Sequence, residues 1–107
     1  MVRIPTHRSP THPGEMLQEE FLAPLSLSPK ELAERIHVAP AEIDELLAER
    51  GSVTPRLALR LGRVFGMSAE FWLNLQLRWE LFHAQRAEAD ELERIHTLEP
   101  QLAGRQS

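Results

Sequence analysis

Residues capable of metal or acid–base chemistry are scattered in this 107-residue chain. Glu80 and His83 have the spacing of half a carboxylate-bridged di-metal site, but such a site needs further paired ligands from other helices. An exposed pair on one helical face is the simpler interpretation. The five histidines are dispersed without metal-ligand spacing, and the absence of cysteine excludes a thiolate nucleophile and a cysteine-based zinc site. The sequence therefore predicts no metal, no cofactor and no enzymatic activity.

The clearest chemistry belongs to the arginines, whose side chains can contact phosphates or the edges of bases. The formal net charge is −4, so the chain as a whole is not a general polyanion binder. One segment differs, because residues 51–66 contain Arg56, Arg60 and Arg63 and no acid, with Arg50 directly before them. Any contact with nucleic acid is therefore predicted to be local to this segment.

Proline and capping residues predict where the elements that carry these arginines begin. A proline fits the first turn of a helix, because its missing N–H has no partner there. Five helices are predicted to begin at His12-Pro13, Ser28-Pro29, Pro40, Thr54-Pro55 and Ser68. Gly51 is predicted to supply the left-handed residue after the third helix, and Gly66 to stop the fourth. No strand pattern occurs, so the predicted fold class is all-α, with five helices and an extended C-terminal helix.

The spacing of these starts also predicts the domain organisation. Residues 1–11 look irregular and are expected to form a flexible N-terminal arm. Residues 12–82 carry the apolar helical stripes and are expected to form the folded domain. Residues 83–95 are mostly alanine, glutamate and arginine, and residues 83–107 are expected to form a helical extension and a tail.

Two short predicted helices, Pro29–Ile36 and Pro40–Ala48, are separated by three residues, the arrangement of a helix-turn-helix motif over residues 28–48. The motif needs a small residue where its helices cross, and Ala33 stands there. It also needs apolar residues that fix the crossing angle, which Val38 and Ile43 supply. The pattern therefore favours a helix-turn-helix over an ordinary helical bundle.

Two tryptophans stand seven residues apart, so both face one side of the fifth helix. Trp72 is expected to fill the small core. Trp79 lies nearer the end of the apolar stripe and could seal a dimer or partner interface. The predicted dimer or partner interface consists of Trp79, Phe82, Leu92 and Ile95. The acidic stretch 88–93 is either a solvated helical face or a surface for a basic partner.

Several of these segments together resemble the HigA antitoxins of the lambda-repressor-like (XRE) helix-turn-helix superfamily. The specific motifs are His12-Pro-Gly-Glu15 and Glu70-Phe-Trp-Leu-Asn-Leu-Gln76, and the similarity extends from residue 12 to about residue 82. The resemblance implies a five-helix domain, a homodimer, binding to a HigB-like RNA-cleaving toxin protein, and repression of the shared operon by binding operator DNA.

This sequence departs from the family at the start of the second motif helix. The family usually has polar or basic side chains there that contact bases, whereas this chain has acids such as Asp44. Acids accept a hydrogen bond from cytosine but are more often repelled by phosphate. His37 stands where the family usually has glycine, and Pro29 where it often has glutamine. Binding to DNA is therefore expected to be weak or atypical and to move toward the arginines. The predicted DNA-contacting residues are Ser28, Pro40, Ala41, Asp44, Arg50, Ser52, Thr54 and Arg56.

The function predicted from the sequence is that of a type II antitoxin that binds its toxin and represses its own operon. A stand-alone transcriptional regulator of the same fold is one alternative. A helix-turn-helix module for protein interaction, with weakened DNA binding, is another. No apolar run is long enough for a membrane span and no signal peptide is evident, so a cytoplasmic location is expected.

Overall fold

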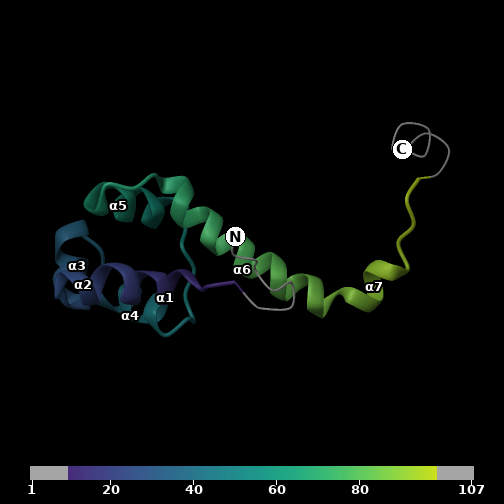
Figure 1. Ribbon diagram of the computed structural model, residues 1–107, viewed down its shortest axis with the longest axis horizontal. Helices are drawn as coiled ribbons and strands as arrows, with labels where there is room; N and C mark the ends of the chain where they lie inside the picture. Colours follow the sequence, from purple (N-terminus) through teal and green to yellow (C-terminus); the bar gives the residue numbers. More distant parts are fainter. Residues whose placement is uncertain (1–9, 99–107) are drawn as a thin grey trace, which may run out of the picture.

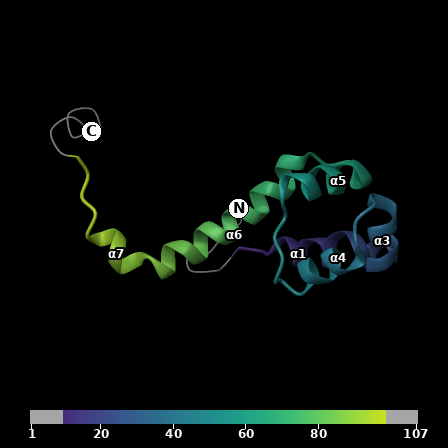
Figure 2. The same ribbon diagram turned by 180° about the vertical axis from the view of Figure 1, so that it is seen from behind.

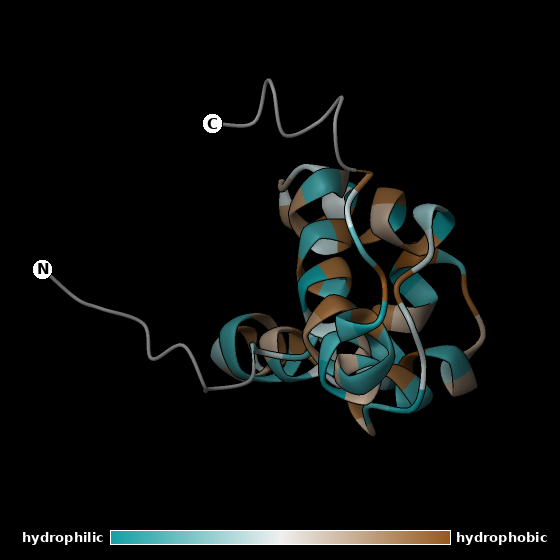
Figure 3. Ribbon diagram, turned by 90° about the vertical axis from the view of Figure 1, so that its right-hand side faces the viewer, coloured by the Kyte–Doolittle hydropathy of each residue, from teal (hydrophilic) through white to brown (hydrophobic). Residues whose placement is uncertain are grey.

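The computed structural model describes residues 10–98, and those residues are helical without any strand (Figure 1). The elements in chain order are α1 (Pro13–Leu17), η1 (Gln18–Leu22), α2 (Ala23–Leu25), α3 (Pro29–Ile36), α4 (Pro40–Leu47), α5 (Pro55–Phe65), α6 (Ala69–Ala87) and α7 (Ala89–Glu93). In Figure 3, apolar and polar residues alternate along the helices, as expected where each helix buries one face. The predicted all-α fold class is confirmed, and the predicted arm 1–11 lies almost wholly outside the described residues.

The first predicted helix is continuous over α1, η1 and α2, with a π-helical turn in its middle. At this turn the Ala23 N–H donates to the Gln18 carbonyl, five residues earlier. Pro24 follows directly, and the wider turn accommodates a residue that cannot donate to the regular helical ladder. Ser26 then ends the helix in the left-handed conformation, with φ 51°.

The helix-turn-helix is present where the sequence predicts it. Ser28 Oγ accepts from the Glu31 N–H at 3.0 Å, and a Glu31 carboxylate oxygen accepts from the Ser28 N–H at 2.9 Å, which completes a capping box at the start of α3. Ala33 is fully buried at the crossing with α4, as are Ile43 and Leu46. The turn residue His37 has φ 61°, so a non-glycine residue holds the left-handed conformation that glycine usually adopts.

The end of α4 corrects one prediction, because the left-handed residue is Glu49 (φ 61°) and not Gly51. The Glu49 N–H donates to the Leu46 carbonyl and the Arg50 N–H to the Glu45 carbonyl, the two bonds of a Schellman motif. Gly51 is needed for a different reason. A Cβ there would lie 3.3 Å from the Leu46 nitrogen and from the Glu45 Cβ, so the loop packs tightly on the end of α4.

The core lies between α1, α3, α4, α5 and the first half of α6. Trp72 is its largest fully buried side chain, with Phe21 and Phe71 at ring-centroid distances of 5.2 Å. Helices α5 and α6 approach closely at Gly62, where a Cβ would lie 2.6 Å from the Met67 carbonyl oxygen. Gly66, with φ 70°, ends α5 as predicted.

The second half of α6 and all of α7 extend away from the rest of the helices (Figures 1 and 2). The boundary predicted at residue 82 falls inside α6, which is one helix to Ala87 before Glu88 separates it from α7. Leu77 and Leu81 on α6 are more than half exposed. Within residues 10–98, none of the helices combines the length and apolar character needed to cross a bilayer.

Candidate nucleic-acid interface

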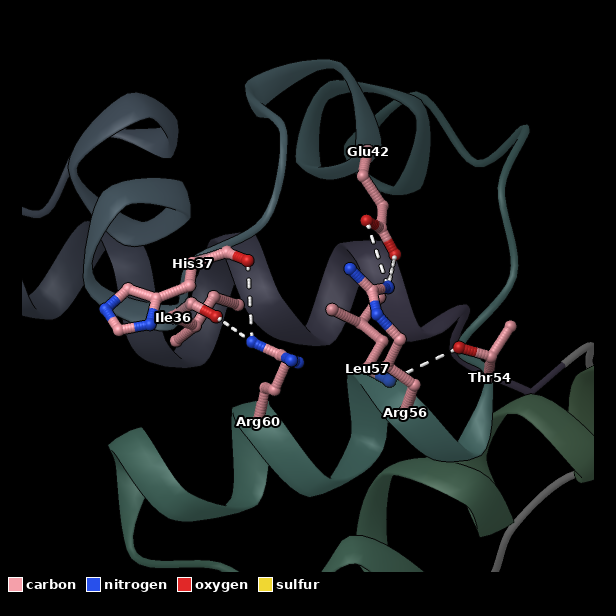
Figure 4. Close-up of polar contacts among 7 residues, drawn as sticks. All are labelled: Ile36, His37, Glu42, Thr54, Arg56, Leu57 and Arg60. Atoms are coloured by element: carbon pink, nitrogen blue, oxygen red, sulfur yellow. Dashed lines mark hydrogen bonds and ion pairs between the residues drawn. The ribbon is translucent and has the colours of Figure 1, made fainter.

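The candidate interface is formed by the start of α4, the loop after α4 and the first turn of α5 (Figure 4). The hydroxyl of Thr54 caps α5 by accepting from the Leu57 N–H at 3.2 Å. This cap fixes the start of α5 and thereby places the side chain of Arg56, in the first turn, opposite α4. The loop residue Ser52 is exposed, as are Pro40 and Ala41 at the start of α4.

The two predicted DNA-contacting arginines both form ion pairs with acids of α4. Arg56 Nη1 lies 3.0 and 3.3 Å from the two carboxylate oxygens of Glu42. Arg50 contacts Glu45 through Nε at 3.1 Å and Nη2 at 3.2 Å, a bidentate pair. This pairing lowers the pKa of Glu45 and raises the pKa of Arg50. A phosphate that binds either guanidinium must therefore compete with a carboxylate of the same protein.

The other predicted residues are placed as follows. Ser28 is exposed, but its hydroxyl oxygen already accepts in the capping box of α3. Asp44 is exposed on α4 and takes part in none of the ion pairs found in residues 10–98. The structure thus collects Arg50 and Arg56 beside α4, while the α4 surface itself remains acidic.

Arg60 has a structural role that the sequence does not reveal. Its Nη1 donates to the Ile36 carbonyl at 2.7 Å and lies 3.4 Å from the His37 carbonyl (Figure 4). These carbonyls end α3 and have no helical partner, so a cation stabilises them. Arg60 therefore holds the turn of the motif on α5.

Gln76 is a second residue whose structural role the sequence does not reveal. Its side chain is buried on α6, where Oε1 accepts from the Val53 N–H at 2.8 Å and Nε2 donates to Glu80 at 2.8 Å. Val53 lies in the loop that carries Ser52 and Thr54. The motif over residues 70–76 marks Gln76, but only the tertiary structure shows that it anchors this loop.

His12 connects the start of α1 to the outer half of α6. Its Nδ1 accepts from the Gly14 N–H at 2.9 Å, so it caps α1, as predicted. The Trp79 ring meets the His12 ring edge-on at a centroid distance of 4.8 Å, and the His83 ring centroid lies 4.3 Å from that of Trp79. Burial lowers the pKa of His12, while Glu49 and Glu15 oppose that shift.

Acid is expected to destabilise the fold through His12. In the unfolded chain this group titrates near its ordinary pKa of 6.5, whereas in the fold its pKa is lower. Unfolding therefore takes up a proton at pH values below about 6.5, and the free energy of unfolding becomes smaller as the pH falls through that range. Protonation of Nδ1 also removes the acceptor that caps α1. Urea unfolding at pH 7.5 and 5.5 measures the slope, and His12→Asn, which retains a capping acceptor, should flatten it. An unchanged slope in His12→Asn would assign the acid sensitivity to another group.

The residues of the predicted partner interface lie on the outer half of α6 and beyond it. Trp79 and Phe82 are half-buried, and the Arg86 guanidinium lies 5.3 Å from the Phe82 ring centroid. Leu92 and Ile95 are 48% and 67% exposed, so the described chain leaves them uncovered. No group of three histidine or acidic residues within residues 10–98 could hold a metal ion.

The fold and this surface define a helix-turn-helix protein of the lambda-repressor-like class. The HTH-type transcriptional regulator YbaQ of Escherichia coli is 40% identical over 102 residues, which cover 92% of this chain and 89% of YbaQ. Antitoxin HigA-1 of Vibrio cholerae is 33% identical over 87% of this chain and 88% of its own length. The structure of the Pseudomonas aeruginosa antitoxin HigA with the higBA promoter matches with a TM-score of 0.80 and 35% identity, over 85% of this chain and 99% of that chain. No protein-family model matches the chain.

These similarities confirm the resemblance seen in the sequence. The chain belongs to the HigA family of helix-turn-helix antitoxins and transcriptional regulators.

Proposed function

We propose that this protein represses its own operon as a homodimer and neutralises a HigB-like toxin by direct binding. The observation that carries the first part is the exposed surface of α4, the following loop and the first turn of α5, in a fold shared with a HigA that was solved on its promoter. The second part is supported by the antitoxin names of its relatives. Its relatives include an HTH-type transcriptional regulator and an antitoxin, and both proposed roles are binding functions.

The ion pairs on α4 must be broken before Arg50 and Arg56 can contact DNA. Glu42 and Glu45 neutralise Arg56 and Arg50 in the free protein, and DNA must replace those carboxylates with phosphates or base edges. Exposed ion pairs of this kind are individually weak, so a phosphate can displace them. Glu42 and Glu45 also repel the phosphate backbone of DNA, which makes operator binding weaker than the fold alone suggests.

Arg56→Ala is expected to weaken operator binding by about 1–3 kcal/mol if the arginine contacts a base edge. If Arg56 contacts only phosphate, the salt dependence should instead fall by about one unit of slope. Glu42→Ala is expected to strengthen binding, because it releases Arg56 and removes a repelling charge. Gel-shift titrations at two salt concentrations measure both effects.

Asp44→Ala is the matched control for Glu42→Ala, since Asp44 is an acid of the same helix without an ion pair in the described chain. It should change affinity less than Glu42→Ala does. If the acidic substitutions abolish binding and Arg56→Ala has no effect, then the acids contact bases and the proposed interface is wrong.

Toxin neutralisation is tested by co-expression with the reading frame that neighbours this one. A stoichiometric complex that restores growth supports the antitoxin function. Repression of the operon without any complex would instead support a stand-alone regulator.

The acidic surface of α4 favours one further candidate, a protein-interaction module with weakened DNA binding. A toxin complex together with no salt-dependent operator shift, in the wild type and in Glu42→Ala alike, would establish that candidate.

A further inference from the structure

A cleft of about 650 Å³ lies between the C-terminal end of α3 and the exposed side of α5. Its lining residues are Arg35, Ile36, His37, Arg56, Leu59, Arg60, Arg63 and Val64. Arg56 joins one end of this cleft to the candidate nucleic-acid interface, and Arg63 and Val64 lie two turns further along α5. Most of the cleft is therefore separate from the surface assigned to DNA.

The cleft combines positive charge with an apolar floor. Four of its eight lining residues are arginines and none is an acid. Arg60 is fixed by the carbonyls that end α3, whereas Arg35 and Arg63 are exposed and form no ion pair with any described acid. Leu59 is 65% exposed on α5. Such a site fits an acidic segment that carries apolar side chains.

The chain itself contains a segment of that chemistry. Glu88, Asp90, Glu91 and Glu93 lie on or beside α7, and all are exposed. The same segment presents Leu92 and, two residues beyond α7, Ile95, both without cover in the described chain. Glu91 pairs with Arg94 of the same segment, whereas Glu88, Asp90 and Glu93 form no ion pair with any described base. These acids and the two apolar side chains thus complement Arg35, Arg63 and the apolar residues of the cleft.

A single chain cannot bring these two features together. The cleft is lined by residues of α3 and α5 and the turn after α3. Helices α3 and α5 lie at one end of the molecule, and α7 lies beyond the projecting half of α6 at the other end (Figures 1 and 2). The described part of the chain measures 56 Å along its longest axis. The occupant of the cleft must therefore come from another molecule.

We propose that the α7 segment of a second copy of this chain occupies the cleft, so that two copies dock reciprocally. The inference rests on the proposed homodimer but requires neither operator nor toxin binding. Reciprocal docking fills both clefts of a dimer with two-fold symmetry, and the same contact occurs twice. Leu92 and Ile95 bury apolar surface in the cleft, and the opposite charges set the orientation of the α7 segment and make the contact specific.

Charge reversal tests the proposal on the full-length protein. Arg63→Glu is expected to raise the dimer dissociation constant about tenfold or more, because it places a like charge opposite the acids of α7. The pair Asp90→Lys and Glu93→Lys should weaken the dimer in the same way, and combining it with Arg63→Glu should restore much of the lost affinity. Sedimentation equilibrium at low and high salt measures these constants, and high salt should weaken the wild-type dimer. Arg78→Glu, on an exposed position of α6, is the control and should have little effect.

Cross-linking gives a second, geometric test, since the chain has no cysteine of its own. Leu59→Cys and Leu92→Cys are prepared as separate single variants, mixed, and oxidised mildly. A disulfide between position 59 of one copy and position 92 of the other is expected, while each variant alone should cross-link little. A mixture that forms only 59–59 or 92–92 links would overturn the proposal.

Two further outcomes would also overturn it. If Arg63→Glu leaves the dimer intact but weakens operator binding, the cleft contacts DNA. If it leaves the dimer intact and only reduces toxin binding, the cleft contacts the toxin. Operator and toxin assays on the wild type are read separately, so a failure of the proposed function is distinguishable from a failure of this dimer contact.

Discussion

Trp72→Ala is expected to reduce the free energy of unfolding by about 3–5 kcal/mol, a large share of the total for a domain of this size. The Trp72 side chain is fully buried where α6 meets α5 and the first helical segment. It contacts the rings of Phe21 and Phe71 and lies 6.3 Å, between centroids, from that of Phe65. Its removal leaves a cavity that three neighbouring rings cannot refill without moving helices. Urea unfolding monitored by circular dichroism measures the change.

Trp79→Ala is the matched control, because Trp79 lies on the same helix but is only half-buried. Its effect on stability should be clearly smaller. Trp72→Phe is informative as well, since the Trp72 Nε1 is buried and finds no acceptor in the described chain. Phenylalanine removes that unsatisfied donor and should cost much less than alanine. Equal losses for Trp72→Ala and Trp79→Ala would mean that the core is not centred on Trp72.

Helix boundaries could be predicted from the sequence because the signals that set them are local. The caps formed by Ser28, Thr54 and Ser68 each involve a backbone N–H only three residues away. Such contacts form whenever the helix forms, so residue type and spacing suffice to identify them. The burial of Ala33 followed from the same local pattern, through the spacing of the two motif helices.

The glycine predicted at the end of α4 shows where local signals fail. Gly51 is the residue with the least steric restriction, but the Schellman bonds place the left-handed position at Glu49. The end of α4 is fixed by its buried Ile43 and Leu46, and tertiary packing therefore outweighs the conformational preference of a single residue.

The candidate interface could be predicted only in part, because its charges are balanced by tertiary contacts. Arg56 and Glu42 are 14 residues apart in sequence and meet only when α5 packs beside α4. Arg60 reaches the end of α3 across 24 residues, and Gln76 reaches the loop at Val53 across 23. The composition of residues 51–66 indicated basic side chains but not which of them are already engaged.

These contacts also show how the fold connects its two proposed binding regions. Gln76 holds the loop beside α4 and bonds to Glu80, one turn before His83. Trp79 lies on the same turns and contacts His12, whose helix packs against α4. A partner that binds the outer half of α6 therefore touches the same helix that anchors the candidate nucleic-acid interface.

The approach of α1 to α4 depends on Gly14, and Gly14→Ala is expected to reduce the free energy of unfolding by about 3 kcal/mol. A Cβ at Gly14 would overlap the Leu46 carbonyl oxygen and lie 2.9 Å from the Leu46 carbonyl carbon. Both are backbone atoms of α4, so no side-chain rotation relieves the overlap. Alanine has the higher helix propensity by up to about 1 kcal/mol, so a measured loss can only come from the contact. Urea unfolding measures it.

Gly66→Ala separates this effect from the general cost of replacing glycine. A Cβ at Gly66 meets nothing within 4 Å, but the residue has φ 70°, so alanine there costs only about 1–2 kcal/mol of left-handed strain. Gly14→Ala must also displace α4, whose start forms the candidate interface. At temperatures where both variants remain folded, operator affinity should fall in Gly14→Ala and stay near the wild-type value in Gly66→Ala. If both retain that affinity, the position of α4 is not what binds the operator, and the contact has to be sought in the loop after α4 and the first turn of α5.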